Sequence, residues 1–133
     1  MSYLLDTDII IFWLKGNQTV ARRATEVGRD HVSTSTVSQA ELYYGAYNSG
    51  QVKQNLAAIQ RLAQTITLRP FDEAAAQYFG QIKANLTQQG QILLDADIMI
   101  AAIALANTLV LVTNNTKHYV RISGLTLENW ANP

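Results

Sequence analysis

The 133-residue sequence contains no cysteine and only 2 prolines. The absence of cysteine excludes disulfide bonds, thiolate metal ligands and a cysteine nucleophile, and it is typical of proteins from a reducing compartment. No continuous apolar stretch reaches the roughly 18 residues that a membrane-spanning helix needs. Flexible linkers, internal repeats and charge runs are also missing. We therefore expect one cytoplasmic domain over residues 1–133, with no membrane association.

Neither sign of charge is in excess, because 10 Lys and Arg residues balance 10 Asp and Glu residues. A net charge of zero argues on its face against a nucleic-acid-binding protein. The distribution matters more than the sum, since acidic residues gathered in one cleft would leave a basic surface around it. The candidates for such a cleft are Asp6, Asp8, Glu41, Asp95 and Asp97.

Apolar residues are abundant, at 48% of the chain, and they fall into strand-like and helix-like runs in alternation. Apolar and β-branched runs predict strands at 3–6, 31–36, 65–68 and 108–113, and a short one at 125–129. Helical spacing predicts helices at 7–16, 19–27, 37–48, 52–64, 72–88 and 92–107. Strands alternating with helices form parallel β-α units. The predicted fold is therefore a three-layer α/β/α sandwich with a central, mostly parallel sheet.

Polar residues stand near the points where the predicted strands end. Asp6 closes the first strand, Glu41 lies one turn into the helix after the second, and Asp97 opens the helix before the fourth. Asn114 and Asn115 follow that fourth strand. Ligands of parallel sheets bind beyond the carboxyl ends of the strands. We therefore expect these side chains to converge on one edge of the sheet.

Several of these acids also have a purely structural interpretation as helix caps. Asp6 is a candidate cap, although Thr7 or Asp8 can take that role and leave Asp6 free at the strand edge. Asp8 itself is favoured as a cap over a ligand. Glu41 stands three residues after Ser38, which is the spacing of a capping box with Ser38 as the cap.

Asp95 and Asp97 cannot do the same job, because residues two apart on a helix point in roughly opposite directions. Asp95 suits the N-cap, where a carboxylate meets free amide groups and the positive end of the helix dipole. Asp97 then lies in line with Ala101 and Ala104, whose small side chains let the helix approach the sheet. We favour Asp97 as the chemical residue.

Carboxylates that gather at one edge repel one another and raise each other's pKa unless a cation is present. An oxygen-rich cluster without cysteine and with little histidine suits Mg²⁺ or Mn²⁺ over Zn²⁺. Such an ion activates water and holds a phosphate group in line for displacement. The acids therefore predict a Mg²⁺ site, with Mn²⁺ as a substitute.

The sequence resembles the PIN-domain family, and within it the VapC-type toxins of bacterial toxin–antitoxin pairs, over nearly its whole length. "YLLDTDIIIFWLKGN" is similar to the family's opening, in which a strand delivers an Asp followed by Thr and usually Asn. "TVSQAELYYGA" resembles the segment that bears the family's catalytic Glu. "DIMIAAIALANTLVLVTNNTKHYVRISGLTLENW" is similar to the Asp-x-x-Ile-Ala-Ala helix, the next strand, the Thr-Asn-Asn turn and the terminal Glu-x-Trp.

This resemblance implies that the catalytic, metal-binding acids are Asp6, Glu41 and Asp97. The fourth acidic position of the family, often Asp, falls near Asn115. Because Asn carries no charge, a second metal would be held weakly or would arrive with the substrate.

Four further residues are supporting candidates. Asp8 replaces the usual Asn of the family and adds a carboxylate, and Asp95, favoured as a helix cap, is a second possible supporting acid. Thr113 and Asn114 are candidates for orienting a carboxylate or a phosphate, although Thr113 can equally just end its strand. The roles of all four stay open at this point.

The function implied by the resemblance is a Mg²⁺-dependent endoribonuclease toxin that cleaves structured RNA, either tRNA or a ribosomal RNA loop, and so inhibits translation. A cognate antitoxin and a homodimer are implied as well. Three tyrosines on the 37–48 helix cannot all face one way, so at least one is expected at the surface or an interface. Candidates for RNA-phosphate contacts, each equally explicable as a solvated charge, are Lys15, Arg22, Arg23, Lys117, His118 and Arg121.

Two alternatives stand beside this function. A non-catalytic RNA-binding module of the same fold is favoured by Asn115, because the fourth acid is missing. A phosphatase that forms an aspartyl phosphate, or a nuclease acting on DNA, is suggested by the Asp-x-Asp at 6–8. The downstream Lys expected for such a phosphatase is not evident.

Overall fold

The computed structural model describes all 133 residues and contains a 5-stranded sheet. Its strands are β1 Tyr3–Leu5, β2 Val32–Ser35, β3 Thr67–Arg69, β4 Val110–Val112 and β5 Leu127–Glu128. Its helices are α1 Thr7–Leu14, α2 Gln18–Val27, the 3-10 helix η1 Arg29–His31, α3 Thr36–Tyr47, α4 Val52–Ala63, α5 Glu73–Gln88, α6 Asp95–Ala106 and α7 Thr116–Tyr119. Every predicted strand and helix is present; η1 and α7 were not predicted.

The sheet has the strand order β3-β2-β1-β4-β5, and every pairing is parallel. This confirms the predicted parallel α/β fold. From β1 the chain builds the sheet in one direction through β2 and β3, and then returns to add β4 on the other side of β1. Such a reversal opens a crevice at the carboxyl ends of the two strands between which it occurs. The crevice here lies beyond the ends of β1 and β4.

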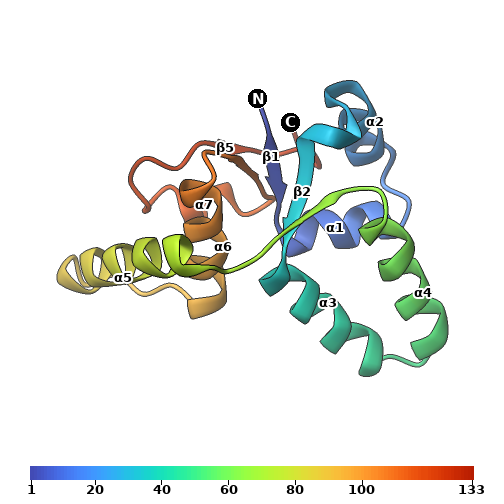
Figure 1. The fold of residues 1–133 in the computed structure, drawn as a ribbon, viewed down its shortest axis with the longest axis horizontal. Coiled ribbons are helices and arrows are strands. Elements are labelled where there is room, and N and C mark those ends of the chain that lie inside the picture. The colour runs from blue at the N-terminus through green and yellow to red at the C-terminus, as the bar shows by residue number, and fades with distance from the viewer.

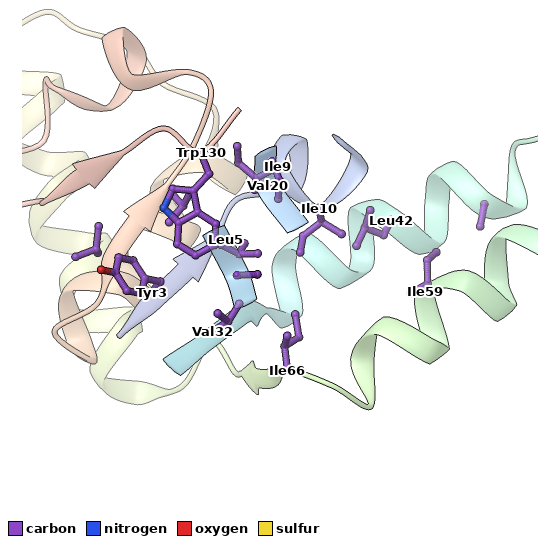
Figure 2. Close-up of a cluster of buried hydrophobic side chains, with 14 residues drawn as sticks. Tyr3, Leu5, Ile9, Ile10, Val20, Val32, Leu42, Ile59, Ile66 and Trp130 are labelled. Atoms are coloured by element: carbon purple, nitrogen blue, oxygen red, sulfur yellow. The ribbon is translucent and has the colours of Figure 1, made fainter. Parts of the chain in front are cut away.

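Helices cover both faces of the sheet, as Figure 1 shows, with α5, α6 and α7 on one side and α1 to α4 on the other. Alternate strand residues point to opposite faces. Tyr3 and Leu5 therefore belong to the buried cluster beneath α1 to α4 (Figure 2), and Leu4 belongs to the cluster beneath α5 and α6. Burying one such leucine contributes about 1.5–3 kcal/mol. None of the helices has the length and apolarity needed to cross a membrane.

Helix α6 lies directly against the sheet. Ala101, Ala102 and Ala104 have no exposed surface. Small side chains at the contact allow the helix backbone to approach closely, as the sequence predicts. The start of α6, with Asp97, is thereby held near the carboxyl edge of β1.

The predicted caps of α1 and α6 are wrong. The N-cap of α1 is Asp6, not Thr7 or Asp8, because Asp6 is the only residue between β1 and α1. Helix α6 has Leu94 at the N-cap position and no side-chain cap. Asp95 lies inside its first turn instead, and its carboxylate pairs with a lysine of α5.

Candidate active site

Asp6 lies at the crevice beyond β1, and only 6% of it is exposed. Its Oδ1 accepts a hydrogen bond from the backbone N–H of Thr7 at 2.8 Å, which is the helix cap. Its Oδ2 accepts a hydrogen bond from the hydroxyl of Thr113 at 2.9 Å. Thr113 follows β4, so this second bond crosses the crevice. One oxygen of Asp6 therefore caps α1 while the other faces the predicted site.

Asp8 lies two residues after Asp6, in the first turn of α1, and joins the same edge. Its Oδ1 accepts from the N–H of Ile9 at 2.7 Å, and its Oδ2 accepts from the N–H of Asn114 at 3.1 Å. The Asn114 side-chain oxygen accepts in turn from the amide groups of Asn129 and Asn132. Asp8 therefore has a structural role, because it ties the turn after β4 to α1.

Asp97 and Asp95 point to different surroundings, as the helix geometry predicts. The Asp97 Oδ2 lies 3.0 Å from Nε2 of His118, and its Oδ1 accepts from the Tyr119 hydroxyl at 3.3 Å. Asp95 instead makes a 2.9 Å ion pair with Lys83, and more than half of each side chain is exposed. Asp97 is thus directed into the crevice and Asp95 away from it.

Burial and mutual repulsion perturb the acids at this edge. Desolvation, followed by the charge of Asp8 and then that of Asp97, raises the pKa of Asp6 to about 6, against the lowering effect of its two hydrogen bonds. Desolvation also raises the pKa of Asp8, with a contribution from Asp97. Asp6, Asp8 and Asp97 therefore interact, and we call them the acidic cluster.

Tyr119 is a site residue that the sequence interpretation missed. The residue is 1% exposed, and burial together with the charges of Asp6 and Asp97 raises the pKa of its phenol. The hydroxyl therefore stays protonated and donates to Asp97. The only signal in the sequence is its place beside His118, on a helix that was not predicted.

Glu41 lies at the rim of the crevice, on α3. The Thr7 hydroxyl donates to its Oε1 at 2.6 Å and also lies 2.9 Å from the Ser38 hydroxyl. The predicted capping box is wrong, because Ser35 is the N-cap of α3 and accepts from the N–H of Ser38 at 2.9 Å. The Glu41 carboxylate is thus free of a cap role, exposed, and linked to the acidic cluster through the residue that follows Asp6.

Asn115, at the fourth acidic position, is exposed. Its backbone N–H donates to the Thr113 hydroxyl at 3.0 Å, and its side chain makes no hydrogen bond that caps α7. Thr113 therefore accepts from the turn while it donates to Asp6. This placement gives Thr113 an orienting role beyond ending its strand.

The predicted phosphate contacts fall into three places around the crevice. Arg22 and Arg23 lie on α2, where Arg23 pairs with Glu26 and Glu128 and its guanidinium lies over the ring of Trp130. A second group, Lys117, His118 and Arg121, lies on and just after α7. Lys15, in the third place, lines a groove together with Glu41.

The acidic cluster fits a hard divalent cation by its chemistry. Its donors are carboxylate oxygens, and a cation would offset the burial and, after it, the repulsion by Asp8 and Asp97 that raise the pKa of Asp6. No group of three or more acidic or histidine side chains is close enough to enclose an ion. Mg²⁺ commonly keeps several waters and is held by one or two carboxylates together with substrate phosphates. The carboxylates would therefore hold Mg²⁺ together with water and substrate phosphate, and not in a full protein cage.

The fold and the site define a class, an α/β protein with an acidic site at the carboxyl edge of a parallel sheet. The family model described as PIN domain matches residues 3–124. "tRNA(fMet)-specific endonuclease VapC" of Shigella flexneri is 37% identical over 131 residues, covering 98% of this chain and 99% of that protein. "Ribonuclease VapC2" of Haemophilus influenzae is 38% identical over 132 residues, covering 98% of both.

Solved structures agree with these relatives. VapBC2 from Rickettsia felis, bound to a DNA fragment from its promoter, superposes with a TM-score of 0.93 at 30% identity and covers 98% of this chain and 99% of that chain. DNA-bound VapBC from Salmonella typhimurium has a TM-score of 0.92 at 32% identity and covers 98% of both chains. The chain therefore belongs to the PIN domain family and, within it, to the VapC-type proteins.

Proposed function

We propose that the protein is a Mg²⁺-dependent endoribonuclease toxin that cleaves structured RNA and is neutralised by a cognate antitoxin. The observation that carries the proposal is the acidic cluster at the β1–β4 crevice, in which burial and neighbouring charge raise the pKa of Asp6 to about 6. A carboxyl pKa raised in this way indicates that the ionised form is unfavourable without a nearby cation. The names of the Shigella flexneri and Haemophilus influenzae relatives support ribonuclease activity.

The proposed catalytic residues are Asp6, Asp97 and Glu41, with Asp6 and Asp97 as the inner carboxylates that would hold Mg²⁺, or Mn²⁺ in its place. When bound, the ion supplies activation of water and neutralises phosphate charge. Glu41 reaches the same space from the rim, where the Thr7 hydroxyl fixes one of its oxygens at 2.6 Å. The attacking water and the scissile phosphate would occupy the crevice between the three acids.

Neighbouring residues orient these carboxylates by donating hydrogen bonds to them. The Thr113 hydroxyl donates to Asp6 at 2.9 Å and so favours its ionised form. His118 and Tyr119 contact one oxygen each of Asp97, which fixes the plane of that carboxylate. Because a carboxylate can only accept, the His118 imidazole is the donor in this pair.

The proposed substrate is a tRNA or a ribosomal RNA loop, so that cleavage inhibits translation in the cytoplasm. A relative named as specific for tRNA(fMet) supports the tRNA choice. The basic residues around the crevice would contact phosphates on either side of the cleaved bond, because phosphate contacts position a nucleic acid without reading its sequence. The chain is proposed to act as one domain over residues 1–133, paired with a second copy.

The proposed antitoxin contact is the groove between α1, α3 and α4 beside Glu41. Ile11 and Leu14 line it and are 38% and 37% exposed. Tyr44 and Tyr47 are 72% and 66% exposed on α3, which confirms that the tyrosines of this helix do not all face inward. The VapBC complexes among the solved structures support an antitoxin partner.

The ribonuclease proposal is tested by incubating purified protein with total tRNA, with Mg²⁺ and with EDTA, and mapping the RNA ends. Cleavage should require Mg²⁺ and should fall at least about 100-fold in Asp97→Asn, given the size of such catalytic contributions. Asp95→Asn is the matched control, because that acid lies two residues away and points to Lys83. RNA that the wild type binds but leaves intact would instead support the non-catalytic RNA-binding module.

The antitoxin proposal has a separate test. Ile11→Asp places a charge in the groove and should prevent the antitoxin from inhibiting cleavage, while cleavage without antitoxin continues. Co-expression with the protein encoded beside this gene, followed by co-purification, measures the complex. Inhibition that persists in Ile11→Asp would place the antitoxin elsewhere on the surface.

A further inference from the structure

Arg69, the last residue of β3, shares a row of the sheet with Asp6. Arg69 pairs in register with Ser35 of β2. One position earlier on each strand, Leu68 of β3 pairs with Thr34 of β2, and Thr34 pairs with Leu5 of β1. The next position along β1 is Asp6, which contacts Thr113 of the neighbouring strand. In a parallel sheet, paired residues project to the same face. The row at the carboxyl edge is therefore Arg69, Ser35, Asp6 and Thr113.

This row faces the same side of the sheet as Asp97. Leu68 and Thr34 line a cavity with Ile10 on the side of α1 to α4. Alternation directs the following residues, Arg69 and Ser35, to the opposite face, which α5 and α6 cover. The sequence interpretation missed this position, because it ended the strand at Leu68 and placed Arg69 outside it.

The guanidinium of Arg69 lacks a partner. Its Nε is the one buried side-chain nitrogen or oxygen without a hydrogen bond in the whole structure. Arg69 also takes part in none of the ion pairs, whereas Arg23 pairs with two glutamates. Buried donors in folded proteins are almost always paired, so an exception calls for an explanation. The terminal nitrogens of Arg69 also form no hydrogen bond and are not buried, so an anion that arrives from outside would meet the guanidinium there.

The electrostatics of the crevice favour such an anchor. Without a bound cation the acidic cluster repels a phosphate backbone that crosses it, and cations on the flanks of the crevice would offset that repulsion. The strand order places β3 at one end of the sheet and β5 at the other, with the crevice between them. Arg22 and Arg23 lie on the β5 side, next to Glu128. Arg69 is the cation at the β3 end of the row.

We propose that Arg69 binds a phosphate of the RNA strand that flanks the cleaved bond on the β3 side. This inference rests on the proposed ribonuclease function and assigns the path of its substrate along the carboxyl edge, from β3 toward β5. Two strand spacings separate the backbones of Arg69 and Asp6, roughly 10 Å, which is a length of a few nucleotides. The two terminal nitrogens of the planar guanidinium can donate two parallel hydrogen bonds to one phosphate.

The experiment measures the salt dependence of RNA binding. A fluorescein-labelled RNA stem–loop is titrated with full-length protein carrying Asp97→Asn, which prevents cleavage, at several NaCl concentrations. Adding Arg69→Gln should weaken RNA binding about 5- to 30-fold. The slope of the logarithm of the binding constant against the logarithm of the salt concentration should become smaller in magnitude by about 0.7, the value for one phosphate contact on a single strand. Arg69→Lys should restore the slope and only part of the affinity, because lysine keeps the charge without the fork.

Arg61→Gln is the matched control. Arg61 is exposed in the last turn of α4, which leads into the amino end of β3, so it lies toward the opposite edge of the sheet. The same change of charge there should leave the slope unaltered. Thermal unfolding separates binding from folding, because losing a donor that has no partner should not lower the Tm of Arg69→Gln.

A slope and affinity of Arg69→Gln equal to those of Arg61→Gln would overturn the inference, even if the wild type cleaves RNA with Mg²⁺. A loss of slope in Arg69→Gln supports it, even if no RNA is cleaved, and in that case only the ribonuclease proposal fails. Protein that binds no RNA at any salt concentration contradicts both.

Discussion

His118 Nε2 lies 3.0 Å from Asp97 Oδ2, and this contact joins the short helix α7 to the first turn of α6. The two residues come from segments on either side of β4, so the contact holds the edge of the crevice in one arrangement. Tyr119, next along the chain, reaches the other oxygen of the same carboxylate. Two consecutive residues of α7 therefore orient the one acid that α6 contributes to the cluster.

Replacing His118 should impair catalysis through Asp97. His118→Ala leaves Asp97 with one donor fewer, and loss of such an orienting contact typically lowers metal affinity or activity about 10- to 100-fold. We expect kcat to fall within that range and the Mg²⁺ concentration for half-maximal activity to rise. His118→Gln, which can still donate, should recover part of both. Lys117→Ala is the control, and an equal loss in that variant would assign the effect to RNA binding.

Asp6→Asn should stabilise the metal-free protein while it abolishes cleavage. The pKa of Asp6 is raised from 3.8 to about 6 in the folded state, so the folded protein binds the proton more tightly than the unfolded chain does. The resulting stability is present in full below about pH 4 and is lost as the pH rises through 6. Asn mimics the protonated acid and avoids this loss.

Urea unfolding of wild type and Asp6→Asn in EDTA measures the effect. At pH 7.5 the variant should have the larger free energy of unfolding, by about 1–3 kcal/mol, and the difference should shrink toward pH 4. A difference that grows as the pH falls would mean that the ionised form of Asp6 is the stabilising one, and the proposed repulsion would then be wrong.

The positions of the site residues along the chain are largely predictable, whereas their local contacts are not. The strands that end at Asp6 and Thr113 are apolar runs with abrupt polar ends, and parallel pairing brings such ends together. The caps were assigned wrongly because β1 runs into α1, and β2 into α3, without a loop. Ser35 is therefore both the last residue of β2 and the cap of α3, and Asp6, which directly follows β1, caps α1. In such cases the spacing of polar residues favours a later residue as the cap.

Tyr119 and Arg69 show why the other residues of the site could not be predicted from the sequence. The Tyr119 hydroxyl meets Asp97 only because α6 and α7 flank β4, and nothing in the local pattern records that contact. Arg69 belongs to the row of Asp6 only through the register of β3 on β2. A shift of one residue in that strand would direct its side chain to the other face.

Magnesium should stabilise the wild type but not Asp6→Asn. An ion that binds only the folded state adds about 2.7 kcal/mol at 100 times its Kd, which corresponds to a rise in Tm of several degrees for a domain of this size. Differential scanning fluorimetry over a MgCl₂ series, with NaCl at matched ionic strength as the reference, measures the rise. A saturable rise of equal size in Asp6→Asn would place the ion away from the acidic cluster.

Thr113→Val should shift the pH dependence of cleavage, because Thr113 stabilises the charged form of Asp6. The Thr113 hydroxyl is fully buried, donates to Asp6 at 2.9 Å and accepts from the N–H of Asn115 at 3.0 Å. Valine has the same shape but leaves both partners unsatisfied, at a cost of about 1–3 kcal/mol of stability. Without this donor the pKa of Asp6 rises further, and the acidic limb of the pH–rate profile should move to higher pH. Thr113→Ser, which keeps the hydroxyl, should retain the wild-type profile. An unmoved profile in Thr113→Val, with the same loss of stability, would reduce Thr113 to a structural residue of the turn.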